Sequence, residues 1–213
     1  MMFGDGALTF REFAMREPLP LATIHGAVLE FLRGRDDAAL YGAQAVNAYV
    51  DEARMTQDVD LLSPRAADLA EEVRSFLHQR FQIAVRIRRI REGIGYRIYQ
   101  VRKPKNRHLV DVRNVPSLPA TQRVDDILVL TPTELIASKV LALAQRRGRP
   151  KSGTDWRDMA MLLLTFPELK KDAGPVRDRL EADVSMGADP TVLDTWKDLV
   201  AQEIVPEDED DAY

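Results

Sequence analysis

The chain has 213 residues, of which 45% are hydrophobic and 30% are charged, with a formal net charge of −4 and no cysteine. These values are typical of an ordinary globular protein that buries its core as one large domain or two small ones. The lack of cysteine excludes disulfides and thiolate metal ligands, and no apolar run approaches the roughly eighteen residues of a membrane span. We therefore expect a cytoplasmic protein without a signal peptide and without a membrane partner.

The first half of the chain predicts alternating helices and strands. An irregular or partly helical arm over residues 1–20 precedes a helix over Leu21–Arg33, whose apolar residues recur at helical spacing. Two further helices are predicted at Ala43–Glu52 and from Ser63 to about Arg80. The predicted strands are Ala39–Tyr41, Val59–Leu62, Ile83–Arg91, Tyr96–Arg102, His108–Val115 and Ile127–Leu130.

The second half of the chain is helical from Thr131 onward. Thr131 and Glu134 form a capping box with Pro132 at the first helical position, which predicts a helix start. Further helices are predicted over Asp155–Thr165, Pro175–Asp183 and Pro190–Glu203. We therefore expect a core of residues 1–130 with its N-terminal arm, a helical domain of residues 131–206 and an acidic tail of residues 207–213.

Two carboxylates in the second predicted strand are the strongest functional signal. Asp58 and Asp60 stand at i and i+2, so a strand would project both from one face. Such like charges repel unless a cation lies between them, and Mg²⁺ prefers carboxylate oxygens. The preceding turn, Gly42-Ala43, opens a helix whose free N–H groups favour a phosphate. Together these features indicate phosphoryl or nucleotidyl transfer.

The acidic spacing alone is weak evidence. Acidic pairs at i and i+2 arise by chance roughly five times in a chain of this composition. The alternative is that Asp58 and Asp60 merely end a strand at the surface. Only this pair is embedded in an apolar strand after a glycine turn and a helix, and that context favours the functional interpretation.

Asp111 is the candidate for a third carboxylate. It lies in the predicted strand His108–Val115, which can pair beside the strand of Asp58 and Asp60. Three carboxylates suit a two-metal site in which the third also takes a proton from the attacking hydroxyl. The alternative is a strand residue that is paired with one of several nearby arginines. The three histidines show no metal-ligand spacing and are interpreted as packing or surface residues.

These residues resemble the signature of the DNA polymerase beta-like nucleotidyltransferase superfamily, a small-residue turn and helix followed by Asp-x-Asp and a later Asp. The second half is similar to the AbiEii-type toxin nucleotidyltransferases, in the helical segment from Thr133 to Lys139 and in the Asp155–Asp158 motif. The resemblance implies an α+β fold, with a mixed twisted sheet, flanking helices and a C-terminal helical bundle.

The resemblance also implies an activity and its site. It implies Mg²⁺-dependent transfer of a nucleoside monophosphate from an NTP to a hydroxyl of tRNA or protein, in a toxin-antitoxin or phage-defence system with a cognate antitoxin. The implied roles are metal binding and catalysis for the three carboxylates, and nucleotide binding for the turn, a helical lysine and a helical aspartate. These residues are Asp58, Asp60 and Asp111, and Gly42, Ala43, Lys139 and Asp158, respectively.

Ala43 departs from the Gly or Ser of that signature. Its N–H still serves a phosphate, but a serine hydroxyl contact is lost. This leaves a second hypothesis open: a catalytically degenerate binding module or antitoxin-like scaffold with the same fold.

The segment from Arg86 to Arg107 holds nine Lys or Arg and one acidic residue, Glu92. Such a basic hairpin favours binding of a nucleic-acid backbone with steep salt dependence. The alternative is a hairpin that simply extends into solvent.

Overall fold

The computed structural model describes residues 19–90 and 94–206 and divides the chain into two compact units, Met1–Leu130 and Thr131–Tyr213. Residues 1–18 of the expected N-terminal arm, the expected acidic tail and residues 91–93 of the basic segment lie outside the described residues. Within the described residues, no helix combines the length and apolar character that crossing a membrane requires.

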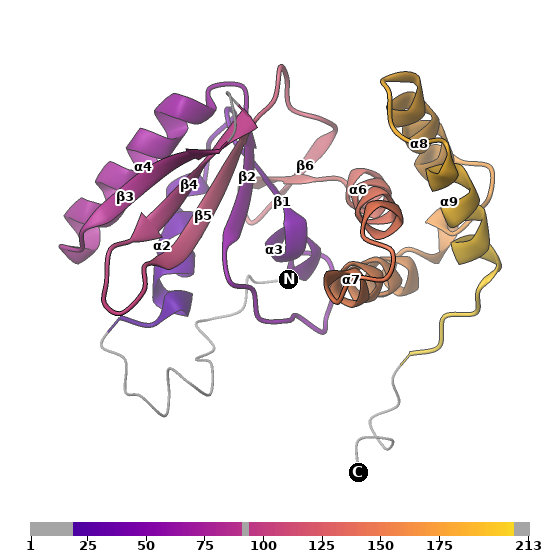
Figure 1. The fold of residues 1–213 in the computed structure, drawn as a ribbon, viewed down its shortest axis with the longest axis horizontal. Coiled ribbons are helices and arrows are strands. Elements are labelled where there is room, and N and C mark those ends of the chain that lie inside the picture. Colours follow the sequence, from indigo (N-terminus) through magenta and orange to yellow (C-terminus); the bar gives the residue numbers. More distant parts are fainter. Residues whose placement is uncertain (1–18, 91–93, 207–213) are drawn as a thin grey trace, which may run out of the picture. The chain divides into compact units, whose positions relative to one another are not determined.

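The first unit is built on a seven-stranded sheet of order β3-β4-β5-β2-β1-β7-β6 (Figure 1). Pairs β2–β5 and β1–β7 are parallel and the remaining pairs are antiparallel, so the sheet is mixed as expected. The strands are β1 (Ala39–Tyr41), β2 (Val59–Ser63), β3 (Val85–Ile90), β4 (Gly95–Gln100), β5 (Arg107–Asn114), β6 (Thr121–Val124) and β7 (Ile127–Leu130).

The two faces of the central strands differ in character. Helices α2 (Leu21–Leu32) and α4 (Ala66–Phe81) pack on one face, where Val59, Val110 and Ile98 lie in register and are fully buried. On the other face the register aligns Asp60 and Asp111, which are only partly buried. Side-chain alternation along β2 and β5 therefore builds the core on one face and leaves the charged residues on the other.

Several boundaries differ from the sequence prediction. Helix α3 (Gly42–Asn47) ends early because the Asn47 side chain donates to the Arg54 carbonyl and accepts from its N–H, which fixes a loop instead. Helix α4 begins after Pro64, because the Ser63 hydroxyl accepts the Arg65 N–H just before it. Strand β6 was not predicted, since its residues are mostly polar, are exposed or half-buried, and show no apolar alternation.

The second unit consists of packed helices. They are α6 (Pro132–Gln145), α7 (Lys151–Thr165), the short 3₁₀ helix η1 (Pro167–Leu169), α8 (Pro175–Ser185) and α9 (Thr191–Ala201). The predicted N-cap is confirmed, since the Thr131 hydroxyl accepts the Glu134 N–H at 3.4 Å, whereas the Glu134 carboxylate accepts from Arg179. Helix α6 contacts α7, α8 and α9 and contributes Leu135, Ile136 and Val140 to a core that Trp196 completes. Helix α7 begins four residues before the predicted start at Asp155.

Candidate active site

Strand register brings the predicted carboxylates to one region of the sheet. Asp60 on β2 and Asp111 on β5 are direct partners in a parallel pair, so they share a face. Asp58 precedes β2 by one residue, and alternation returns it to the same side. All three are half-buried, and all three contribute negative charge at the Tyr41 hydroxyl on the neighbouring strand. Burial, followed by the charge of Asp60, raises the pKa of that hydroxyl above its ordinary range.

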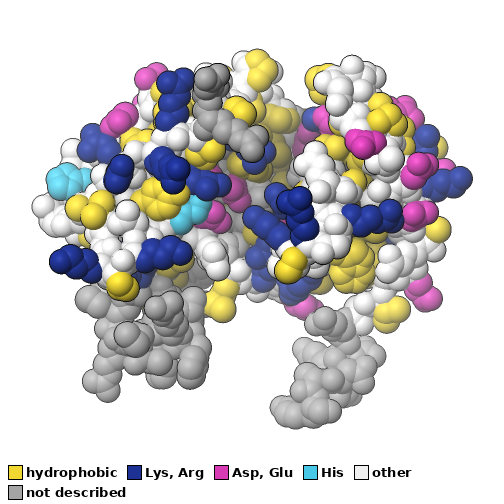
Figure 2. Space-filling model, in the orientation of Figure 1, with side chains coloured by type: hydrophobic (Ala, Val, Ile, Leu, Met, Phe, Trp, Pro, Cys, Tyr) yellow, Lys and Arg dark blue, Asp and Glu magenta, His cyan; other side chains and the backbone are white. Residues whose placement is uncertain are grey.

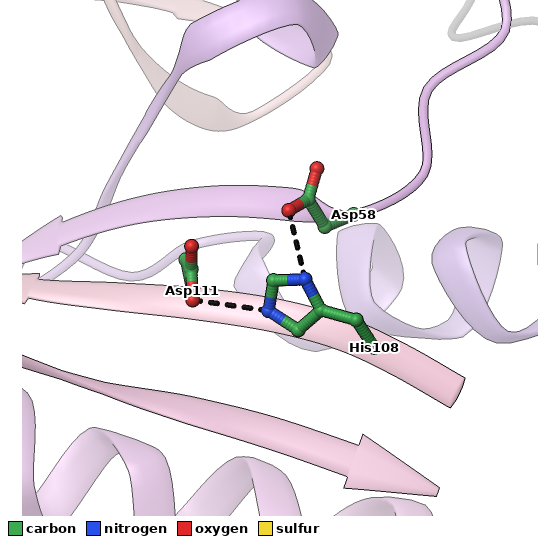
Figure 3. Close-up of side chains that lie close together, drawn as sticks. All are labelled: Asp58, His108 and Asp111. Atoms are coloured by element: carbon green, nitrogen blue, oxygen red, sulfur yellow. Dashed lines mark hydrogen bonds and ion pairs between the residues drawn. The ribbon is translucent and has the colours of Figure 1, made fainter. Parts of the chain in front are cut away.

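His108 bridges two of these carboxylates (Figure 3). Its Nδ1 lies 3.0 Å from Oδ2 of Asp58, and its Nε2 lies 3.0 Å from Oδ1 of Asp111. Burial alone would lower the pKa of the imidazole, but the hydrogen bonds and charges of Asp111 and Asp58 outweigh it and raise the pKa to about 9. His108 is therefore an imidazolium at neutral pH that donates from both nitrogens.

A β-bulge explains how His108 reaches this face. Residues three apart in a regular strand point to opposite faces, so His108 and Asp111 would be separated. In the pairing of β4 with β5, Ile98 lies opposite Val110 and Tyr99 opposite His108, so Leu109 is an extra residue. The bulge shifts the alternation by one, and bulges beside functional sites commonly re-aim side chains in this way. The consecutive apolar pair Leu109-Val110 was the one sequence signal of this shift.

The turn before α3 is fitted closely to Asp60. Gly42 has φ +72°, and a Cβ at this position would lie 2.1 Å from Oδ2 of Asp60. Only glycine therefore allows the turn and the carboxylate to be this close. Gly42 begins α3 and Ala43 follows it, half-buried, so the start of this helix lies beside the Asp60 carboxylate.

Arg97 on β4 provides a second protein cation at Asp111. Its Nε lies 3.0 Å from Oδ1, the same oxygen that His108 contacts. The alternative interpretation of Asp111 as an arginine-paired strand residue thus describes one of its contacts correctly. That contact coexists with the position of Asp111 beside Asp58 and Asp60.

The donor set fits a divalent cation. Asp58, His108 and Asp111 each offer one ligand atom, and these atoms lie within 4.8 Å of one another. Carboxylate oxygens suit Mg²⁺, whereas imidazole nitrogen is a ligand that transition metals prefer. Asp60 lies on the same face as the group but is not one of its members. A hard metal ion would therefore use the aspartates, and His108 occupies the region between them as a positive charge.

The helical unit contains a separate buried charge cluster. Nζ of Lys139 on α6 lies 2.6 Å from Oδ2 of Asp158 and 3.5 Å from Oδ1 of Asp155 on α7. Arg146 holds the other oxygen of Asp155 at 2.6 Å. Lys139, Asp155 and Asp158 are all less than 8% exposed. The structure thus brings Lys139 and Asp158 together, as partners of each other, and their assignment to nucleotide binding stays a prediction.

Comparison with known proteins identifies the family. The model of the family "Nucleotidyl transferase AbiEii toxin, Type IV TA system" matches residues 27–212. No curated protein matches the chain. The Megavirus polyadenylate synthase shares the fold at 15% identity with a TM-score of 0.58, over 74% of this chain and 34% of that one. This chain therefore spans about a third of the length of that protein.

A putative nucleotidyltransferase from H. pylori also shares the fold, at 14% identity with a TM-score of 0.54, over 91% of this chain and 93% of that one. The nucleotidyltransferase-like α+β fold expected from the sequence is thereby confirmed. With its family signature extending over both units, the chain belongs to the AbiEii family of toxin nucleotidyltransferases and is a nucleotidyltransferase.

Proposed function

We propose that this nucleotidyltransferase is the toxin of a type IV toxin-antitoxin pair and transfers a nucleoside monophosphate from an NTP to a hydroxyl of RNA, with Mg²⁺ as its metal. The observation that carries the proposal is the position of Asp58, Asp60 and Asp111 on one face of the sheet, beside the glycine turn at Gly42. His108 and Arg97 offset part of this negative charge through their contacts with Asp58 and Asp111, and a metal ion supplies the further positive charge that the cluster of three carboxylates favours.

Each residue has a role that follows from its chemistry. Asp58 and Asp60 hold the metal through hard carboxylate oxygens. When bound, the metal neutralises charge on the transferred phosphoryl group. The N–H groups of Gly42 and Ala43 bind the outer phosphates of the NTP. The missing serine hydroxyl at Ala43 leaves the main chain as the donor at that position.

Asp111 takes up the proton that the transfer step releases. The acceptor hydroxyl oxygen forms a bond to the α-phosphorus while the bond from that phosphorus to the bridging oxygen of the β-phosphate breaks. Pyrophosphate leaves, and Asp111 accepts the hydroxyl proton as a general base. His108 and Arg97 both contact Asp111, so they position its carboxylate before substrate binds.

RNA is favoured over protein as the acceptor by the charges around the site. Lys and Arg side chains gather over β3 to β5 in Figure 2, and the exposed members of β3 on the same face as the carboxylates are Arg86 and Arg88. Basic side chains of this kind bind a phosphate backbone by releasing counterions and need no base contacts. A protein acceptor offers no such regular row of negative charges.

Lys139 and Asp158 are proposed nucleotide-binding residues on the strength of the family resemblance. Their mutual contact and their burial fix the lysine ammonium in one position. The cognate antitoxin is likewise proposed from the family.

The test is label transfer. Purified protein is incubated with Mg²⁺, each α-labelled NTP in turn, and either total tRNA or a protein extract, and the labelled product is identified. Label on RNA, and none with Asp60→Asn or Asp111→Asn, is the expected result. Label on protein would reassign the acceptor. No label with any NTP would favour the second hypothesis of a degenerate binding module, for which Ala43 is the sequence argument.

A further inference from the structure

Two arginines face each other across the exposed side of β3 and β4. Arg88 is the direct partner of Arg97 in the antiparallel register, and Arg97 is in turn the partner of Asp111 on β5. The three side chains therefore form one row that ends at the candidate active site. Like charges directly opposite each other in a sheet are destabilising, and β3 offers no acidic residue to offset them. Such a row is suited to an anionic ligand.

Arg97 is already engaged with Asp111 in the absence of any ligand. Oδ1 of Asp111 lies 3.0 Å from Nε of Arg97, which donates to it, and 3.0 Å from Nε2 of His108. A divalent metal held by Asp111 would attract the same oxygen lone pairs and repel the guanidinium. Metal binding at Asp111 and the present ion pair of Arg97 therefore compete with each other.

We propose that Arg97 exchanges partners during the reaction: it pairs with Asp111 before the metal binds and with a phosphodiester of the acceptor strand afterwards. Arg88 holds the same strand from across the β3–β4 pair. This inference rests on the proposed function, because the acceptor hydroxyl must lie beside Asp111. A guanidinium offers five donors in a planar fork that matches phosphate oxygens, and the Arg97 side chain is 44% exposed.

The neighbouring row favours single-stranded RNA as the occupant. Arg86 is the partner of Tyr99, and Tyr99 is the partner of His108, with 5.1 Å between the two ring centroids. Aromatic rings and arginine planes are the surfaces on which unstacked bases of RNA are held. The row of Tyr99 and His108 thus offers aromatic rings for base stacking, and the row of Arg88 and Arg97 offers N–H groups that donate to phosphates. An acidic peptide has no bases to use the first row.

The test is RNA binding without chemistry. A labelled, short single-stranded RNA with a free 3′-hydroxyl is titrated with the protein, without NTP, in EDTA and in Mg²⁺ at matched ionic strength. Arg97→Ala is expected to weaken binding about tenfold in Mg²⁺ and to change it little in EDTA, where Asp111 already holds the guanidinium. Arg88→Ala is expected to weaken binding in both conditions.

The matched control is Arg89→Ala, one residue along β3 and on the opposite face of the same strand. It removes the same charge and is expected to leave both affinities unchanged. A second variant tests the exchange directly: Asp111→Asn is expected to tighten RNA binding in EDTA, and the gain is expected to disappear in the double variant with Arg97→Ala.

Arg97→Ala with equal losses in EDTA and Mg²⁺, or with no loss in either, would overturn the exchange. Binding of an acidic peptide in place of RNA would overturn the choice of ligand. The proposed function is tested separately. If Arg97→Ala loses RNA affinity only in Mg²⁺ but the wild type transfers no label to RNA, the exchange of partners is supported and the proposed reaction is wrong.

Discussion

Gly42 and Asp60 are fitted to each other so closely that the carboxylate of Asp60 lies where a side chain at position 42 would begin. A Cβ on Gly42 would lie 2.1 Å from Oδ2 and 2.8 Å from Cγ of Asp60. The turn that starts α3 and the carboxylate on β2 are thus set by one steric constraint. Position 42 therefore needs glycine for two reasons: its backbone adopts a positive φ, and it has no Cβ to meet Asp60.

Gly42→Ala is expected to destabilise the protein by roughly 2–4 kcal/mol, from left-handed strain and from displacement of Asp60. It is also expected to abolish Mg²⁺-dependent transfer, because Asp60 must move. The matched control is Gly148→Ala, where φ is +76° but no atom lies within 4 Å of the added Cβ. Urea unfolding should show only the backbone strain there, roughly 1–2 kcal/mol. Equal losses in the two variants would contradict the steric relationship.

Asp60→Asn tests the metal assignment. Removing one of three clustered like charges relieves repulsion, so the metal-free variant is expected to be slightly more stable than the wild type. Saturating Mg²⁺ is expected to raise the melting temperature of the wild type alone, because a ligand that binds only the folded state stabilises it. Thermal unfolding with and without EDTA measures both effects, and the exposed Asp194→Asn serves as control. Equal Mg²⁺ shifts in Asp60→Asn and wild type would exclude Asp60 as a ligand.

The raised pKa of His108 predicts that the stability of the metal-free protein depends on pH. Its pKa is raised from 6.5 to about 9 in the folded state, so the folded state binds the proton more tightly than the unfolded state does. The resulting stability is fully present below pH 6.5 and is lost as the pH rises through 9, by up to about 3 kcal/mol.

Urea unfolding in EDTA from pH 6 to 9.5 measures this slope. His108→Gln is expected to flatten it, whereas His78→Gln, at an exposed site on α4, is expected to keep it. If the free energy of unfolding of the wild type does not change with pH, or if His108→Gln leaves its pH dependence unchanged, His108 is not a stabilising imidazolium at this site.

Lys139→Ala is expected to destabilise the helical unit by about 3–5 kcal/mol, because it leaves Asp158 buried without its ammonium partner. The exposed Lys151→Ala on α7 is expected to change stability by less than about 0.5 kcal/mol. The double variant Lys139→Met and Asp158→Asn should recover part of the loss, which a double-mutant cycle quantifies. Additive losses would show that the contact contributes no coupling energy.

The parts of the site that obey simple periodicity could be predicted from the sequence. Alternation places Asp58 and Asp60 on one face, and the strand prediction over His108–Val115 allowed Asp111 to join them; β2 and β5 are adjacent in the sheet. The N-cap at Thr131 followed from an equally local signal, whereas the fold class followed from the family resemblance.

The parts that depend on register or on distant partners could not be predicted. His108 was interpreted as a packing or surface residue, and it reaches the carboxylates only because of an extra residue in β5. Lys139 was expected to bind a nucleotide, and nothing in its local sequence indicates that tertiary packing buries it against Asp158. In both cases the deciding information is which segment lies opposite, and a single strand or helix does not contain it.

The bulge at Leu109 shifts side-chain alternation in β5 by one residue, so the residues before it and after it follow different patterns of facing. Deleting one residue there would restore a continuous alternation and turn His108 toward the apolar layer, while Asp111 kept its place beside Asp60. Length in this strand is therefore as strictly constrained as residue identity. A substitution at Leu109 would alter packing, whereas a deletion would remove a charge from the site without changing any of its residues.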